Sequence, residues 1–211
     1  MNFAIIAQQL VSGMGSSLMI FVLTLLFSMP LGLLVAFGRM SKIKPLQAVI
    51  KVFIAILRGT PLMLQLLVVN FAPYYLFRIS LPRWYRFAAI IIGFSINYAA
   101  YFAEIYRSGI ESIPKGQYEA ASVLGYNKNQ TFFRIIFPQM VKRVLPPVTN
   151  EVITLVKDTS LAFVLAYEEM FTVAKQIASA RTSIMPLFVA GVFYFIFNGV
   201  VAFAMERIER K

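Results

Sequence analysis

Four long stretches of the sequence contain no charged residue, and they constrain the fold more than any other feature. They cover residues 1–38, 59–77, 87–103 and 182–205. A helix needs about 20 mainly apolar residues to cross the hydrocarbon core of a membrane, and these stretches are close to or beyond that length. The sequence therefore predicts an all-α membrane protein.

Composition excludes several classes of protein. Apolar residues make up 59% of the chain, charged residues make up 14%, and Cys and His are absent. We therefore expect no metal site of the usual zinc type, no imidazole base and no thiol chemistry. No G-x-x-x-x-G-K-[ST] phosphate loop is present, so we expect no catalytic residue and no ATP hydrolysis by this chain alone.

Five membrane spans are expected in a single transmembrane domain over residues 1–211. The fourth of them in chain order is the least clean, because it includes Glu151, Lys157 and Asp158. The largest segment outside the spans is the loop 107–146, and a pathway for a polar solute usually needs more than five helices, so we expect an oligomer. The predicted spans are 14–37, 58–77, 87–106, 147–167 and 184–205.

Basic residues predict the orientation. Thirteen Lys and Arg residues fall on the side of the loop 107–146 and of the C-terminus, against five on the opposite side. The positive-inside rule then places the N-terminus outside and the C-terminus in the cytoplasm. The same rule explains the net charge of +11 better than nucleic-acid binding does, because most basic residues lie between apolar runs. A cleaved signal peptide is not expected, since the first 38 residues lack a basic start.

The loop 107–146 contains a spaced motif. Glu119, Ala120 and Ala121 are followed by three residues, Gly125, nine residues and the segment 135–138, which reads IIFP. This spacing resembles the EAA motif of ABC-importer permease subunits. The only departure is Phe137, where the family pattern has Leu. Within the segment 119–125, Glu and Ala favour a short helix, and Gly can supply the left-handed turn that ends it.

The motif has a physical interpretation of its own. Small alanine side chains let another protein surface approach closely, and the Glu119 carboxylate suits a basic partner. We therefore interpret the segment as a docking helix for ATPase coupling, with Glu119, Ala120, Ala121 and Gly125 as its key residues. A plain amphipathic linker helix is the alternative.

Three more segments extend the resemblance to residues 14–205. Segments 57–62 (LRGTPL), 97–104 (NYAAYFAE) and 157–161 (KDTSL) resemble permeases of the polar amino acid uptake branch, similar to those for histidine, glutamine, arginine and cystine. The resemblance implies a type I ABC importer permease fold in the cell membrane (inner or plasma membrane). It also implies a dimer with a second permease subunit, identical or related, and an extracytoplasmic amino acid-binding protein. Two ATP-binding subunits would hold ATP and Mg, so this chain would carry no cofactor and would not be an enzyme.

Two acidic residues inside a span are candidates for substrate binding. Glu151 and Asp158 are seven residues apart, which brings them to within about 20° of one another on a helix. Ionisable groups in a span are costly and usually face the protein interior, a partner or water. They could bind the ammonium or cationic side chain of an amino acid, or they could form an interhelical polar network.

Other polar residues in the spans are weaker candidates for substrate binding. Asn97, Tyr101 and Glu104 share one helix face by their spacing. Asn97 is a candidate for substrate binding or for interhelical hydrogen bonding, whereas Glu104 more plausibly supports the base of the loop 107–146. Gln65 is a further substrate-binding candidate, one turn after a possible helix break at Thr60.

The break itself has two interpretations. Thr60 and Pro61 could cap a half-helix whose positive end faces a carboxylate. Alternatively, Pro61 kinks the chain between an interfacial helix over 46–57 and the span proper, with Arg58 at the lipid boundary, and we favour this interpretation.

Two rival functions remain open. An autonomous ion-coupled carrier or channel would use Glu151 and Asp158 to bind protons or Na⁺, but it leaves the motif at 119–125 without a purpose. An intramembrane hydrolase is poorly equipped without His or Cys. On the outward side, Arg78, Arg83 and Arg86 are either contacts for the binding protein or solvated loop charges.

Overall fold

The computed structural model describes residues 3–210, and within that range it contains helices and short connections but no strand. The predicted all-α class is therefore confirmed for the described part of the chain. Its elements are α1 (Phe3–Arg39), α2 (Lys44–Gly59), α3 (Leu62–Phe77), α4 (Tyr85–Glu111), α5 (Lys115–Val123), α6 (Lys128–Thr131), the π-helix η1 (Phe132–Ile136), α7 (Phe137–Asp158), the 3₁₀-helix η2 (Thr159–Leu165), α8 (Met170–Arg181) and α9 (Met185–Glu209).

Three helices are long and apolar enough to cross a membrane: α1, α4 and α9. The pair α2 and α3 counts as a fourth span if it is taken together, although the two helices are bent by 111° at their junction. Helix α7 begins ten residues before the predicted span 147–167 and carries Lys142 and Arg143 in its first part. The number of five spans therefore stays a prediction.

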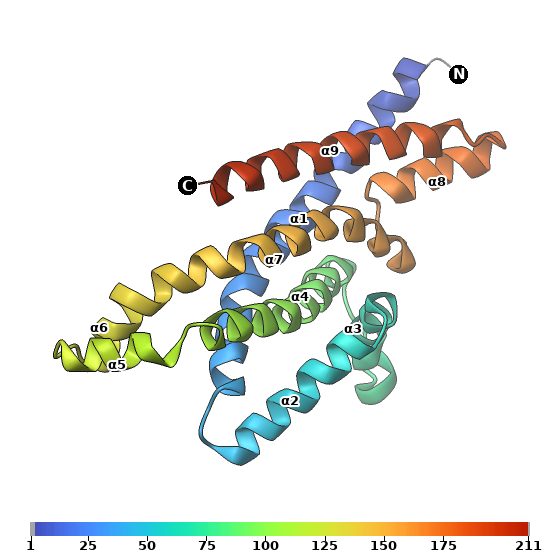
Figure 1. The fold of residues 1–211 in the computed structure, drawn as a ribbon. Coiled ribbons are helices and arrows are strands. Elements are labelled where there is room, and N and C mark those ends of the chain that lie inside the picture. Colours follow the sequence, from blue (N-terminus) through green and yellow to red (C-terminus); the bar gives the residue numbers. More distant parts are fainter. Residues whose placement is uncertain (1–2, 211) are drawn as a thin grey trace.

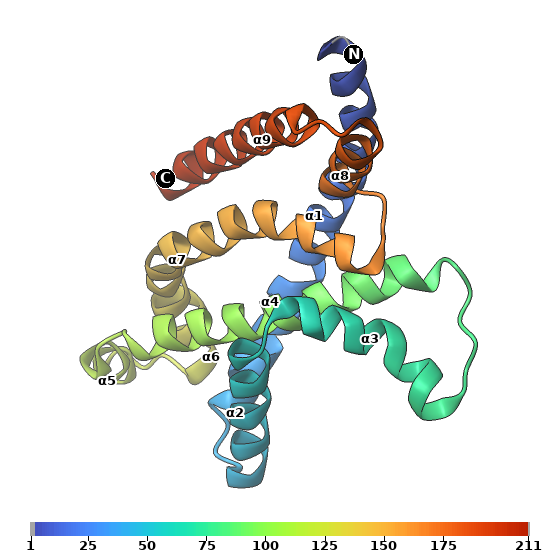
Figure 2. The ribbon, with the colours of Figure 1, turned by 90° about the vertical axis from the view of Figure 1, so that its right-hand side faces the viewer.

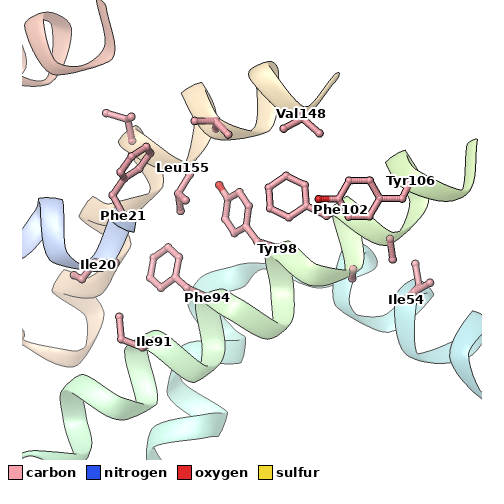
Figure 3. Packing of buried hydrophobic residues seen from close by; sticks show 14 of the residues in the cluster. Ile20, Phe21, Ile54, Ile91, Phe94, Tyr98, Phe102, Tyr106, Val148 and Leu155 are labelled. Carbon is pink, nitrogen blue, oxygen red and sulfur yellow. The ribbon is translucent and has the colours of Figure 1, made fainter. Parts of the chain in front are cut away.

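Helix α4 is the central helix of the fold. Its buried face contacts α1, α3 and α7, and the aromatic side chains on it form much of the core. Figure 3 shows Phe94, Tyr98 and Phe102 extending from α4 toward Leu155 and Val148 of α7. This packing fixes which face of α7 meets α4.

Helix α1 crosses α4 at close range because Gly32 has no side chain. A Cβ atom built there would lie 2.7 Å from Cβ of Phe102 and 3.1 Å from the carbonyl oxygen of Ala99. Small residues at such a crossing are typical of helices that pack in membranes, where close backbone contact supplies much of the association energy.

The fold has two distinct ends. Helix α5 and the C-terminus lie on one side, whereas the loop 78–84 and the connection between α8 and α9 lie on the opposite side (Figures 1 and 2). We call these the α5 end and the Arg83 end. The motif at 119–125 and the exposed arginines of the loop are therefore at opposite ends of the molecule.

Candidate functional site

Helix α5 contains the E-A-A motif and is largely exposed. It begins at Lys115, four residues before the predicted start at Glu119. Glu119 and Ala120 face solvent, but Ala121 is only 1% exposed and packs inward. Of the two alanines, Ala120 alone is therefore accessible to a partner in the described structure.

The end of α5 has the left-handed turn that the sequence predicts. Gly125 has φ of +76°, and its N–H donates to the Ser122 carbonyl at 3.0 Å. The N–H of Tyr126 donates to the Ala121 carbonyl, also at 3.0 Å. These two bonds form a Schellman motif, which satisfies carbonyls at the end of the helix.

Apolar side chains at this turn are unusually exposed. Val123 is 88% exposed and Leu124 is 72% exposed. A membrane does not explain them, because they lie on a short helix with Glu119, Lys115 and Gln117, all exposed. A mixed apolar and charged surface of this kind is typical of a protein interface.

Two hydrogen bonds connect α5 and its base to α7. Nε2 of Gln139 donates to Oε1 of Gln117 at 3.4 Å, and Nη1 of Arg143 donates to the Ser112 carbonyl at 2.6 Å. The π-helix η1 comes just before Pro138, which has no N–H for a regular helical bond. The first turns of α7 are therefore attached to α5 and to the turn that precedes it.

Asp158 lies at the other end of α7. The Tyr98 hydroxyl of α4 donates to Oδ2 of Asp158 at 2.7 Å, and Tyr98 is only 2% exposed. The chain tightens to the 3₁₀-helix η2 directly after this carboxylate. Tyr98 was not among the residues predicted from the sequence, because no spacing rule shows which tyrosine of 97–104 faces α7.

Glu151 lies two turns before Asp158 on the same continuous helix, about 10 Å along its axis. The carboxylate is partly buried, and within residues 3–210 it makes no hydrogen bond or ion pair. Arg58 is near enough to act on the Glu151 carboxylate electrostatically. The Arg58 guanidinium itself lies over the Tyr101 ring, with its carbon 5.1 Å from the ring centroid. Glu151 is thus a partly buried carboxylate that no described residue neutralises by direct contact.

Asn97 and Gln65 are both engaged at the break between α2 and α3. Their side-chain amides donate to the Leu57 carbonyl at 3.1 and 2.8 Å, and Asn97 also donates to Oε1 of Gln65 at 3.0 Å. A sharp break leaves helix-end carbonyls without partners, and these amides replace the lost bonds. The contacts match the interhelical hydrogen bonding that the sequence left as one alternative for Asn97.

Of the two interpretations of the break, the structure agrees with the favoured one, a sharp bend between two helices at Pro61, and not with capping by Thr60. Its hydroxyl donates to the Ile56 carbonyl at 2.8 Å and accepts from Gln65, while Pro61 occupies the N-cap position of α3 without a side-chain cap. The side chain of Thr60 therefore stabilises the end of α2 rather than the start of α3. The predicted helix before the break is present as Lys44–Gly59.

Glu104 joins the ends of two helices near the loop 107–146. Its carboxylate lies 2.7 Å from Nη2 of Arg107 and 3.8 Å from Nε of Arg39, the last residue of α1. Its position at the base of this loop agrees with the supporting role that the sequence suggests. The carboxylate is thus already paired with two cations.

A buried carboxylate that sequence analysis missed joins α1, α8 and α9. Glu169 is fully buried and accepts from Ser17 at 3.3 Å, Tyr194 at 3.0 Å, and both the N–H and hydroxyl of Thr172 at 2.6 and 2.8 Å. Burial raises the pKa of Glu169, and the hydrogen bonds oppose that effect. Acidic residues are also common near helix starts, so its position alone gave no special signal.

These features define a class of protein: a helical membrane protein with polar contacts between its central helices and a short, exposed helix at one end. The chain belongs to the family described as binding-protein-dependent transport system inner membrane component, whose profile matches residues 28–211. It is therefore a multi-pass membrane protein and the permease component of an ABC amino acid importer family.

Several relatives match most of the chain. The L-cystine transport system permease protein of Bacillus subtilis (strain 168) is 37% identical over 192 residues, which are 90% of this chain and 80% of that protein. A putative glutamine transport system permease protein of Rickettsia felis is 34% identical over 192 residues, 90% of this chain and 86% of that protein. The arginine transport system permease protein of B. subtilis is 30% identical over 203 residues, 96% of this chain and 91% of that protein.

Solved structures agree with the fold. A chain from the crystal structure of an amino acid ABC transporter with histidines superimposes with a TM-score of 0.88 and 29% identity, covering all of this chain and 98% of that one. A chain of the inward-facing MetNI methionine ABC transporter gives a TM-score of 0.78 at 19% identity, with the same coverage, and supports the fold alone.

Proposed function

We propose that this chain is the membrane-spanning subunit of an ATP-driven importer that moves a polar amino acid into the cytoplasm by alternating access. One observation carries the proposal: α7 is hydrogen-bonded to α5 through Gln139 and to the turn before α5 through Arg143, and it carries Glu151 and Asp158 further along. Movement of α5 by a partner would therefore reach both carboxylates through a single helix.

The substrate site is centred on Asp158 and Glu151. Asp158 is held by Tyr98, and an ammonium group at this position would gain both charge and hydrogen-bonding partners. Glu151 receives the second cationic group, where the substrate has one. Asn97 and Gln65 hold the break between α2 and α3 beside this site and position it rather than bind substrate.

Coupling occurs at α5. The exposed Glu119 and Ala120, with Val123 and Leu124 at the following turn, dock in a groove of an ATP-binding subunit. Ala121 and Gly125 shape the helix and its end. Two such subunits bind ATP and Mg and perform the hydrolysis, so this chain is not itself an enzyme.

The assembly contains further partners. A second permease subunit, a copy or a relative, completes the pathway, and lipid covers the remaining apolar surface. An extracytoplasmic amino acid-binding protein delivers substrate to the Arg83 end. Five spans with the N-terminus outside and the C-terminus in the cytoplasm place α5 on the cytoplasmic side, where the ATP-binding subunits are.

The test is ATPase activity in proteoliposomes that contain the chain, its ATP-binding partner and the binding protein. Each amino acid is supplied in turn, and one or a few should stimulate hydrolysis. E119K should abolish stimulation, because it reverses the charge on the docking surface. E206K is the matched control, since Glu206 is 62% exposed at the same end but lies on α9.

Failure has a clear form. If no ATP-binding partner associates and solute still crosses with an ion gradient, the chain is an autonomous carrier that uses Glu151 and Asp158. If hydrolysis is stimulated equally in E119K and in the wild-type chain, the docking assignment to α5 is wrong.

A further inference from the structure

A polar hollow at the Arg83 end lies outside the proposed substrate site. It has a volume of about 400 Å³ and lies among α1, the start of α4 and the turn after η2. Small-molecule sites in proteins commonly have volumes of about 300–1,000 Å³. The residues that line the hollow are Ser16, Arg83, Arg86, Ala166, Tyr167 and Glu168.

Charges in the hollow are not neutralised within the chain. Arg83, Arg86 and Glu168 are exposed, and among the described residues none of them has an opposite charge within 4.0 Å. Nη1 of Arg86 donates to the Ala166 carbonyl at 3.3 Å, which uses one of five guanidinium donors. Two neighbouring cations and one anion thus remain available to a ligand.

The wall that holds Glu168 is fixed by the fold. Ala166 has a left-handed backbone with φ of 50°, which turns the chain after η2. The Tyr167 ring stacks on Phe87 of α4 at 5.4 Å, and the next residue after Glu168 is the buried Glu169. Glu168 therefore projects from a segment anchored on both sides, close to the start of α4 where the arginines lie.

We propose that this hollow is an outer binding site for a free α-amino acid. The carboxylate of the ligand pairs with Arg83 and Arg86, and its ammonium pairs with Glu168. This inference rests on the proposed function, because the site would receive substrate before it reaches Asp158. The 3₁₀-helix η2 connects the two places, and at about 2 Å per residue Asp158 lies roughly 16 Å from Ala166 along the chain.

The sign of each charge favours a zwitterion over an acidic protein surface. Arg83 and Arg86 alone would suit an Asp or Glu side chain of a docking partner. Glu168 lines the same hollow and would repel such a side chain, whereas it attracts the ammonium of an amino acid.

The test is equilibrium binding of labelled L-arginine, L-glutamine and L-cystine to the permease–ATPase complex in nanodiscs, without the binding protein. The double variant E151Q/D158N removes the proposed inner site. It should retain one weak site for at least one probe, and adding R83Q or E168Q should weaken that site by roughly two- to fivefold, as expected for loss of one exposed ion pair. R181Q is the matched control, because Arg181 is exposed on α8 and does not line the hollow.

Competition and docking measurements decide between ligands. Propionate, which has a carboxylate but no ammonium, should not displace the amino acid. Absence of residual binding in E151Q/D158N, or binding unaffected by R83Q and E168Q, would overturn the proposal. It would also be overturned if R83Q weakened the affinity of the binding protein while E168Q strengthened it, because the hollow would then accept an acidic protein surface.

Failure of the proposed function is distinguishable. It would appear as a wild-type complex without ATP-dependent uptake of any amino acid. Failure of the outer site would leave that uptake intact and remove only the residual binding.

Discussion

The Tyr98 hydroxyl donates to Oδ2 of Asp158 at 2.7 Å and joins the central helix α4 to the end of α7. Asp158 is the last residue of α7 before the chain tightens into η2. A carboxylate at such a transition changes position when either helix moves. The hydrogen bond therefore links the packing of α4 and α7 to the position of the Asp158 carboxylate, which we propose binds the substrate.

Two variants separate charge from positioning at this pair. D158N removes the negative charge, so uptake should fall by at least tenfold. Y98F keeps the charge but loses one hydrogen bond to a charged group, worth about 1.5–3 kcal/mol, so the KM for uptake should rise roughly tenfold or more while the maximal rate changes less. Uptake kinetics in proteoliposomes measure both. If D158N and E151Q left the kinetics unchanged for every amino acid tested, the substrate site would be elsewhere.

Adjacent alanines in α5 should respond differently to the same substitution. A120W places a large side chain on the exposed face and should prevent association with the ATP-binding subunit without changing thermal stability. A121W forces the side chain into a packed position and should destabilise the protein by about 1–3 kcal/mol. Co-purification and thermal unfolding in detergent measure the two effects. Equal behaviour of the two variants would contradict the orientation of α5.

The amides of Gln65 and Asn97 should act as one unit. Both amides donate to the Leu57 carbonyl, so after either single change to Ala the carbonyl still has one side-chain donor. The double change leaves that carbonyl without a side-chain donor, and the two amides also bond each other, so its destabilisation should differ from the sum of the single effects by about 0.5–3 kcal/mol. A double-mutant cycle on thermal stability measures this difference. Additive stability effects combined with weaker substrate binding would instead assign the two residues to substrate.

Glu169 should tolerate a neutral isostere better than truncation. Glu169→Gln keeps the chain length and an oxygen acceptor at the start of α8, and burial already disfavours the charge, since it raises the pKa of Glu169. Glu169→Ala leaves the donors of Ser17, Thr172 and Tyr194 without their partner, which should cost about 1–3 kcal/mol for each donor that stays buried and unpaired. Thermal unfolding compares the two. A Gln variant as unstable as the Ala variant would show that the charge itself is required.

Local signals in the sequence predicted part of this structure. The apolar blocks indicated the long helices, and Gly125 marked the end of α5 because few other residues adopt its positive φ readily. The spacing of Glu151 and Asp158 placed both on one helix, which α7 confirms. Each of these inferences depends on residues close together in the chain.

Contacts between distant segments could not be predicted in this way. Tyr98 meets Asp158 across 60 residues, and Ser17 meets Glu169 across 152. Which face of a helix meets its neighbour depends on how the helices cross, and that is set by packing such as the approach of α1 to α4 at Gly32. The inward direction of Ala121 has the same origin.

The most direct measurement is uptake of labelled amino acid into proteoliposomes that contain the chain with its ATP-binding subunit and binding protein. Uptake is compared between vesicles loaded with ATP and vesicles without it. The account predicts uptake that requires ATP, persists without an ion gradient and disappears in E119K but not in E206K. Uptake by the chain alone, driven by an ion gradient and independent of ATP, would contradict it.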